Sequence, residues 1–255
     1  MTKLLLLSLL IACTTPTFNT EGVKEEPIAL AKDLLTAIRD NQDYEQYQET
    51  LADLDAKYLA NALPTDEHKL AFWLNIYNAY IQSILSENPE LFENRGDFFG
   101  EPRVTIAGQE LSFDDIEHGI IRSSQIKLSG GFLGKLFVGK YEKMMRTEER
   151  DGRIHFALNC GAKSCPPVAI YEYERLNEQL DESSKRYLTQ TTDYNKEEKV
   201  AKVTALFSWF RGDFGGLDGA KNFLQRYGIT EPGADPDLEF KEYDWTLDLG
   251  NYIDL

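Results

Sequence analysis

Hydrophobic residues recur every three or four positions along much of the chain, which is the period of an amphipathic helix. Leu30, Leu34 and Ile38 follow this spacing and predict a helix over residues 27–41. A helix is expected over residues 65–85, and because residues 70–85 are apolar nearly all round, we expect it to be the central buried helix. The same reasoning predicts further helices over residues 44–60, 113–124, 173–188 and 217–227.

Short alternating segments beside turn residues indicate strands. Residues 104–111 predict a hairpin that turns near Gly108, and Asp151-Gly152 predicts a turn into a strand over 153–158. Two more strands are expected, over 200–206 and within 238–249, whereas the glycine-rich start of residues 126–150 predicts no regular element. Helices and strands are intermingled without a boundary. We therefore expect a helix-rich α+β single domain over residues 28–255, with a small, mostly antiparallel sheet.

The N-terminus has the pattern of an export signal. A basic start is followed by an apolar run, Leu4 to Ile11, which is too short to span a bilayer. The sequence Leu10-Ile11-Ala12-Cys13 resembles the lipobox of bacterial lipoproteins. This predicts a signal peptide over residues 1–12, lipidation of Cys13 and a polar linker to residue 27. The alternative is an ordinary cleaved signal in which Cys13 has no role.

Charge narrows the choice of partners. The chain has 27 basic and 43 acidic residues and a formal net charge of −16. Such an excess argues against nucleic acid and against docking on anionic lipid headgroups, and favours a role in solubility. We expect the lipid on Cys13 to hold the protein at the membrane of a bacterial cell envelope.

Two cysteines, Cys160 and Cys165, remain once Cys13 is set aside. In an oxidising compartment this pair can form a disulfide. The alternative is a nucleophile, since the small residues Gly161 and Ser164 would let a substrate carbonyl approach the backbone amides. Pro166 and Pro167 remove the donors after Cys165. Of the two thiols, Cys160 is therefore the favoured nucleophile.

The chain has three histidines from which a general base could come. In a regular strand, the two-residue period would point His155 away from Cys160. His68 falls in the first turn of a helix and is expected at the surface. His118 therefore remains as the candidate base, against the alternative of a solvated helix residue.

Several side chains near His118 could orient its ring. Asp114, Asp115 and Arg122 lie three or four positions from it, hence near one helix face, while Glu117 points about 100° away. A carboxylate in such a place would fix the tautomer of the imidazole. Asp115 is also expected to cap the helix together with the Ser112 side chain.

Two polar residues interrupt the apolar helix. Asn75 and Asn78 lie three positions apart and share a face, and each buried amide must be hydrogen-bonded. We expect them to clamp a loop, or alternatively to orient the site. No cofactor is predicted, and the four-residue gap between Cys160 and Cys165 is long for a zinc knuckle, so no metal is predicted either.

Several separated motifs, in order, resemble the family called domain of unknown function 547, a group of exported bacterial proteins with plant and animal relatives. The resemblance covers residues 65–248 and rests on the segments FWLNIYNAY, LSFDDIEHGIIR, RIHFALNCGAKSCPPV, FSWFRGDFG and YDWTLD. It implies that Glu117, His118 and Arg122 belong to an I-E-H-x-x-x-R motif and Cys160 to an N-C-G motif. Some relatives have serine at the position of Cys165, which favours Cys160 as the essential thiol. Because the histidine precedes the cysteine, as in permuted papain-like hydrolases, analogy suggests a distantly papain-like fold.

These observations lead to a thiol-dependent hydrolase or acyl transferase that acts on a peptide-like or other envelope substrate. Cys160 would be the nucleophile and His118 the base, oriented by Asp114, Asp115 or Glu117. Amides of Cys160 and Gly161 would stabilise the oxyanion, with Asn78 and Arg122 in support. The alternative is a non-catalytic lipoprotein that binds a peptide, glycan or protein and has a Cys160–Cys165 disulfide. A thiol–disulfide redox protein is a third interpretation, although the spacing is not C-x-x-C.

Overall fold

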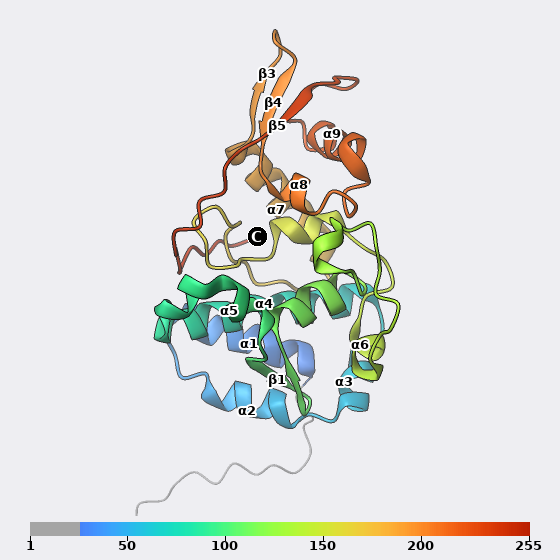
Figure 1. Cartoon of the computed structure of the whole chain (residues 1–255). Helices are drawn as coiled ribbons and strands as arrows, with labels where there is room; N and C mark the ends of the chain where they lie inside the picture. Colours follow the sequence, from blue (N-terminus) through green and yellow to red (C-terminus); the bar gives the residue numbers. More distant parts are fainter. Residues whose placement is uncertain (1–25) are drawn as a thin grey trace, which may run out of the picture.

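The computed structural model describes residues 26–255. The predicted signal peptide, Cys13 and most of the linker lie outside these residues. The described chain is a helix-rich α+β domain, which confirms the predicted fold class (Figure 1). Within it, no helix has the length and apolarity needed to cross a bilayer.

The central helix is α4 (Asp66–Glu87), and it is buried on nearly all sides, as predicted. Helix α1 (Pro27–Arg39) packs along it in the lower layer of Figure 1. The predicted helix over 44–60 is wrong in one respect, because it is two helices, α2 (Glu45–Asp53) and α3 (Ala56–Ala62). The Asp55 side chain accepts hydrogen bonds from the first amides of α3 and so starts a new helix.

Short elements continue from α4 around the lower layer. They are the 3-10 helix η1 (Pro89–Asn94), α5 (Arg95–Gly100), the hairpin β1 (Val104–Ile106) and β2 (Gln109–Leu111), the π-helix η2 (Asp115–Ile121), the 3-10 helix η3 (Lys127–Ser129) and α6 (Lys140–Met145). Ala107 and Gly108 form the hairpin turn with φ of 51° and 72°, the left-handed conformation that a two-residue turn requires.

The predicted strand over 153–158 is wrong. Residues Gly152–Phe156 form the 3-10 helix η4, whose N-terminus is capped by Asp151. Ile154, His155 and Phe156 are all buried, so the alternation of a strand is absent. The prediction that His155 points away from Cys160 therefore loses its basis.

The upper part contains α7 (Leu176–Thr191), β3 (Asp193–Asn195), β4 (Val200–Val203), α8 (Leu206–Trp209), α9 (Gly216–Arg226) and β5 (Asp237–Phe240). Strand β4 pairs antiparallel with β3 and parallel with β5. Together with the β1–β2 hairpin, this makes two small sheets, mostly antiparallel as predicted. Phe156, Phe207 and Phe214 belong to a second hydrophobic cluster, which also contains Ala201 and Val203 of β4.

The C-terminal tail after β5 runs back to the lower helices, as the red trace in Figure 1 shows. Its backbone bonds to the loop of the two cysteines, with Lys163 N donating to Thr246 O and Asp248 N donating to Gly161 O, each at 2.8 Å. The tail thereby places Tyr243 and Trp245 beside the cysteine loop.

Candidate active site or ligand cavity

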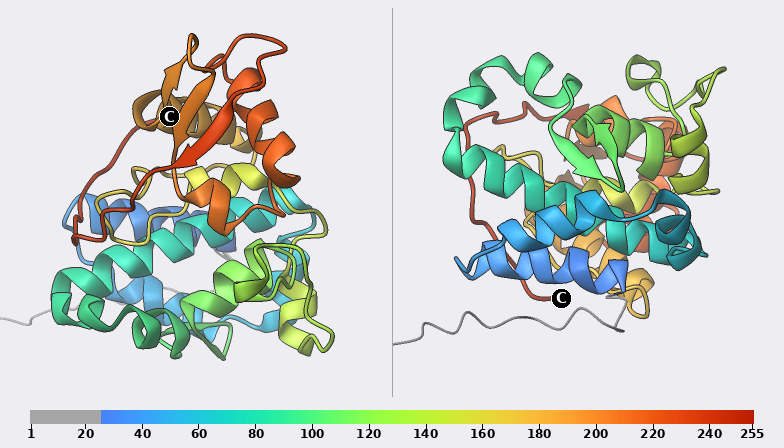
Figure 2. Two further views of the ribbon diagram at one scale, coloured as in Figure 1. Left: turned by 45° about the horizontal axis from the view of Figure 1, so that its top comes forward. Right: turned by 90° about the horizontal axis from the view of Figure 1, so that it is seen from below.

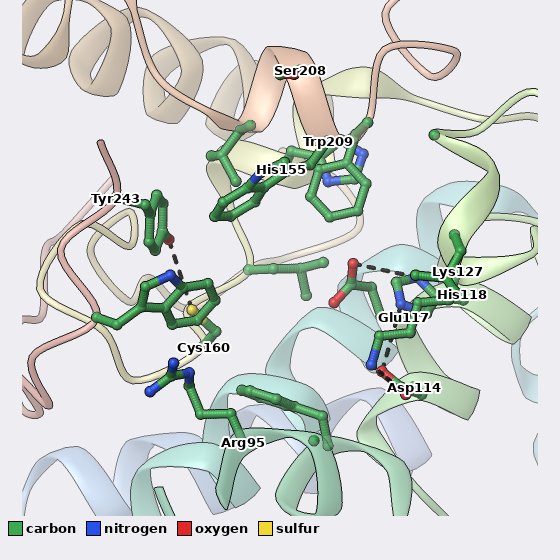
Figure 3. Close-up of a pocket in the computed structure, with 18 of the residues that line it drawn as sticks. Arg95, Asp114, Glu117, His118, Lys127, His155, Cys160, Ser208, Trp209 and Tyr243 are labelled. Carbon is green, nitrogen blue, oxygen red and sulfur yellow. Dashed lines mark hydrogen bonds and ion pairs between the residues drawn. The ribbon is translucent and has the colours of Figure 1, made fainter. Parts of the chain in front are cut away.

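A cavity of about 570 Å³ lies where α4, α5 and η2 meet η4, α8 and the C-terminal tail. Cys160 and Tyr243 lie at one end and Asp114, Glu117 and His118 at the other (Figure 3). We call these the cysteine end and the histidine end. The cavity wall is rich in aromatic side chains: Tyr77, Phe99, Trp209, Phe210, Tyr243 and Trp245.

At the cysteine end the two sulfur atoms are bonded to each other as a Cys160–Cys165 disulfide. Cys160 borders the cavity and Cys165 is buried behind it. The Tyr243 hydroxyl lies 3.2 Å from the Cys165 sulfur and 3.7 Å from that of Cys160. In this state Cys160 is not a thiolate.

Asn159 organises the loop that carries this disulfide. Its side-chain oxygen accepts from Gly161 N at 2.9 Å and its amide nitrogen donates to Pro166 O at 2.7 Å. Asn78 supports the same turn, because its side chain donates to Ala157 O at 3.0 Å and accepts from Asn159 N at 2.9 Å. The loop is therefore fixed by buried amides before any ligand arrives.

The amides expected to form an oxyanion site are already occupied, so this prediction is corrected. Cys160 N donates to the Cys165 sulfur at 3.0 Å, and Gly161 N donates to Asn159. Gly161 is required for another reason. Its φ is +87°, and a Cβ there would lie 2.8 Å from Leu85 Cδ1.

The histidine end is built around the buried ring of His118, which is not the solvated residue of the alternative interpretation. Arg122 Nη1 lies 2.7 Å from His118 Nδ1, and because a guanidinium only donates, Nδ1 is the acceptor. The hydrogen is then on Nε2, which faces Asp114 Oδ1 at 3.5 Å. Both ring nitrogens therefore have partners within the protein.

Asp114 is the aspartate that faces His118, and Asp115 is not. The Asp115 carboxylate accepts from the Ser112 amide at 3.0 Å and hydroxyl at 2.7 Å, which confirms the predicted capping box. Asp114 also accepts from Lys127 Nζ at 2.7 Å. Burial by itself raises the pKa of Asp114, but the hydrogen bonds from His118 and Lys127 outweigh it and lower that pKa.

Glu117 is the carboxylate that opens to the cavity with weak internal contacts. Its oxygens lie 3.5 Å from His118 Nδ1 and 3.5 Å from the Tyr77 hydroxyl. Burial, and then the charge of Glu117, raise the pKa of Tyr77 well above its usual value. The carboxylate of Glu117 therefore interacts electrostatically with Tyr77, one of the aromatic side chains of the cavity wall.

Beside His118, a buried ionic network joins Arg122 to Asp213 and to His155, which also lines the cavity. Arg122 is 1% exposed and donates through Nε to Asp213 at 2.6 Å, and His155 Nε2 lies 2.8 Å from the same carboxylate. The Phe210 ring stacks on His155 at 3.8 Å between centroids and lies 4.7 Å from the Arg122 guanidinium. Arg150 completes the set around Asp213 at 3.1 Å.

The pKa values at this network follow from burial and pairing. Burial raises the pKa of Asp213, but the hydrogen bonds from His155 and Arg122 outweigh it and hold that pKa far below its usual range. Burial lowers the pKa of His155, and this effect exceeds the opposing one of Asp213. The pair is thus a neutral imidazole that donates to an ionised carboxylate.

Sequence reasoning placed some residues at the cavity and misplaced others. Cys160, His118, Glu117, Asp114 and His155 line it. Other candidates lie behind it: Asn75 clamps Tyr171 through two bonds of 2.9 Å, and Ser164 Oγ accepts from Asp244 N in the tail. Missed residues are Asn159, Asp213 and the aromatic side chains of 209–210 and 243–245, although the segments FSWFRGDFG and YDWTLD are conspicuous in sequence.

Cys160 and His118 both line this cavity but lie at its two ends (Figure 3), so the predicted catalytic pair stays a prediction. Within residues 26–255, however, no hydrogen bond joins the Cys160 sulfur to the His118 ring. The same described residues contain no group of three or more histidine, cysteine, aspartate or glutamate side chains able to hold a metal ion.

The family comparison concerns half of the chain. Residues 61–188 match the family described as "Protein of unknown function, DUF547". The chain belongs to this family. No curated protein and no solved structure matches it, and the distantly papain-like relationship stays a prediction. The DUF547 match includes the cysteine loop and η2, whereas Asp213 and the aromatic side chains of 209–210 and 243–245 lie beyond it.

Proposed function

We propose that this DUF547 protein binds a peptide segment in the cavity without catalysing a reaction there. One observation carries the proposal: the groups that a thiol hydrolase needs are all engaged inside the protein. The Cys160 sulfur is bonded to Cys165, and the amides of Cys160 and Gly161 have acceptors. The acceptor nitrogen of His118, Nδ1, is taken up by Arg122 at 2.7 Å, while Nε2 faces Asp114 at 3.5 Å.

The cavity wall favours a ligand with an apolar body and a positively charged group. Trp209, Tyr243 and Trp245 form an aromatic cluster with centroid distances of 4.8–5.7 Å. The Arg95 guanidinium already lies 4.8 Å from the Trp245 ring centroid, so a cation–π contact is compatible with this wall. Glu117 supplies a carboxylate for an ammonium or guanidinium of the ligand. A peptide with a lysine or arginine side chain fits this chemistry better than a neutral glycan.

The test is a titration of the full chain with two short peptides, one with lysine and one with glutamate at the same central position. Intrinsic fluorescence reports on Trp209 and Trp245. We expect the lysine peptide alone to bind, and Glu117→Gln to weaken binding about tenfold, the effect of roughly 1.5 kcal/mol for a charged hydrogen bond. The matched control is Glu182→Gln, at a surface pair with Arg186. Binding of neither peptide, or equal binding to both variants, would refute the proposal.

The thiol-dependent hydrolase or acyl transferase is the second candidate. It is favoured by the position of Cys160, Glu117 and His118 on one cavity. It requires a free Cys160 thiol in the native protein and a rearrangement that releases a His118 nitrogen. A thiol count on Cys13→Ala with a fast alkylating reagent separates the candidates. Two free thiols and selective alkylation of Cys160 support the hydrolase, and none supports the binding protein.

We also propose that the protein is exported and lipid-anchored through Cys13 in a bacterial envelope. The apolar run and lipobox-like sequence support this location. Incorporation of a labelled fatty acid into the wild-type protein, and its loss in Cys13→Ala, is the expected result. Equal labelling of both would contradict the assignment.

A further inference from the structure

One segment of the surface, residues 123–140, differs from the rest in both polarity and charge. Six of the nine exposed large hydrophobic side chains of residues 26–255 lie in it. Leu128, Leu136 and Phe137 are 92%, 90% and 93% exposed, so they contact almost nothing within the protein. An apolar patch of this kind on a soluble surface indicates an interaction site.

The segment is basic in an acidic protein. It contains Lys127, Lys135 and Lys140 and no acidic residue, whereas the whole chain has a formal net charge of −16. Lys127 pairs with Asp114 and Lys135 with Glu142, both from outside the segment. These two acids partly offset the positive charge of the segment. Lys140 is exposed and is the first residue of α6.

The exposed side chains stand on a fixed base. Lys135 N donates to Ser124 O at 2.7 Å and Ile126 N donates to Leu133 O at 2.9 Å, which closes the base of the loop. Gly212 N donates to Gly130 O at 2.6 Å and ties the loop to the turn that carries Asp213. In the right view of Figure 2 the yellow-green segment projects from the helices. The leucine and phenylalanine side chains are therefore presented outward by an ordered backbone.

We propose that residues 123–140 dock into the interface of an anionic lipid bilayer. Leu128, Leu136 and Phe137 would enter the boundary between headgroups and acyl chains, and the flanking lysines would lie at the headgroups. The three lysines of the segment and its lack of acidic residues favour a lipid surface of this kind over an apolar protein groove. The formal charge of −16 opposes docking on anionic headgroups, as the composition predicted. Screening over about 8 Å at physiological ionic strength reduces this repulsion to that from charges close to the bilayer, where the apolar side chains and the lysines of the segment lie. Docking does not require that the cavity bind a ligand.

The docking segment also borders the cavity, since Lys127, Leu128 and Gly130 belong to its lining. A docked protein would thus hold the histidine end of the cavity next to the membrane surface. This arrangement would add a second contact to any lipid on Cys13 and would set which face of the molecule points toward the bilayer.

The test places a tryptophan at the tip of the segment and measures its quenching by brominated lipids. The full chain is used with Phe137→Trp and, as a matched control at an exposed phenylalanine elsewhere, Phe240→Trp. The signal of the unchanged protein is subtracted, so that residues 1–25 and the native tryptophans contribute equally. Vesicles are phosphatidylglycerol–phosphatidylcholine mixtures or phosphatidylcholine alone.

We expect strong quenching of Phe137→Trp on the anionic vesicles, weak quenching on the neutral ones, and little quenching of Phe240→Trp on either. Adding Leu136→Asp to Phe137→Trp should reduce the fraction bound at least about tenfold, because one apolar anchor is replaced by a charge. Quenching of both positions alike, or of neither, overturns the proposal, and a partner protein then becomes the occupant to seek. Equal quenching on neutral vesicles overturns the assignment to anionic lipid.

Discussion

The cysteine end of the cavity is held by neutral groups, whereas the histidine end is held by buried charges. At the first, Asn159 and Asn78 bond to backbone groups and a disulfide closes the turn. At the second, Arg122 and Asp213 form an ion pair with almost no exposure. The cysteine end therefore depends on the redox state, and the histidine end depends on charge and pH.

The largest effect is expected at the buried charges. Asp213→Ala removes the partner of Arg122 and of His155 and leaves a guanidinium that is 1% exposed without its counter-ion. Breaking a buried pair in this way costs about 3–5 kcal/mol in the free energy of unfolding. Chemical denaturation of the purified protein measures this loss. The control Glu182→Gln breaks an exposed pair and should change stability by less than about 0.5 kcal/mol.

If the Asp213→Ala variant is as stable as the control, the ionic network does not hold the histidine end together. A decrease confined to Asp213→Ala would instead show that the two ends of the cavity have different sources of stability. Arg122→Met removes the other partner of the pair, but Asp213 keeps Arg150 and His155, so the loss should be smaller than that of Asp213→Ala.

The second effect is at the cysteine end and is smaller because the loop is short. The cysteines are five positions apart, and the chain-entropy relation for a loop of this length gives about 2 kcal/mol. Cys160→Ser with Cys165→Ser should lower the free energy of unfolding by about this amount. Denaturation of the wild-type protein with and without a reductant gives an independent measure, and the double variant should not respond to the reductant.

The outcome also bears on the proposed function. A reductant that has no effect on the wild-type stability would mean that the cysteines are free in the native protein. In that case the Cys160 sulfur would be available as a nucleophile, the main argument for peptide binding without catalysis would no longer hold, and the hydrolase would become the better candidate.

The difference between the ends also explains what the sequence could predict. The sequence predicts α4, because nearly all of its residues from Leu70 onward are apolar. It also predicts the Ser112–Asp115 capping box, because both partners are close together in the chain. Cys160, Glu117 and His118 were found through their residue types. Asp213 was missed because it meets Arg122 and His155 across 91 and 58 positions, and no local pattern encodes such a pair.

The wrong strand over 153–158 has the same origin. His155 and Phe156 look like alternating strand residues in the sequence. Both are nevertheless buried, because His155 contacts Phe210 and Asp213 and Phe156 contacts Phe214, all of which come much later in the chain. The Asp151 cap, a local feature, starts a 3-10 helix instead. The aromatic wall was missed for a related reason, since the tail returns to the cysteine loop only through long-range backbone bonds.

The smallest predicted effect is a pH dependence that belongs to the histidine end alone. Burial lowers the pKa of His155 below its unfolded value of about 6.5, so stability is full above that pH and falls as the unfolded chain begins to bind the proton. Asp213 has a lowered pKa as well, so its contribution to stability is present above about pH 4 and is lost as the pH falls below it.

Urea denaturation at pH 8, 6 and 4.5 should therefore show a denaturation midpoint that falls below pH 6.5. His155→Gln should flatten the upper part of this decrease, whereas His68→Gln, at a half-buried histidine outside this network, should leave it unchanged. A reductant should shift the midpoints at pH 6 and 4.5 by a similar amount, because the two thiols that it forms have an ordinary pKa of about 8.5 and stay protonated there. Shifts that differ between these two pH values would mean that the two ends of the cavity are coupled.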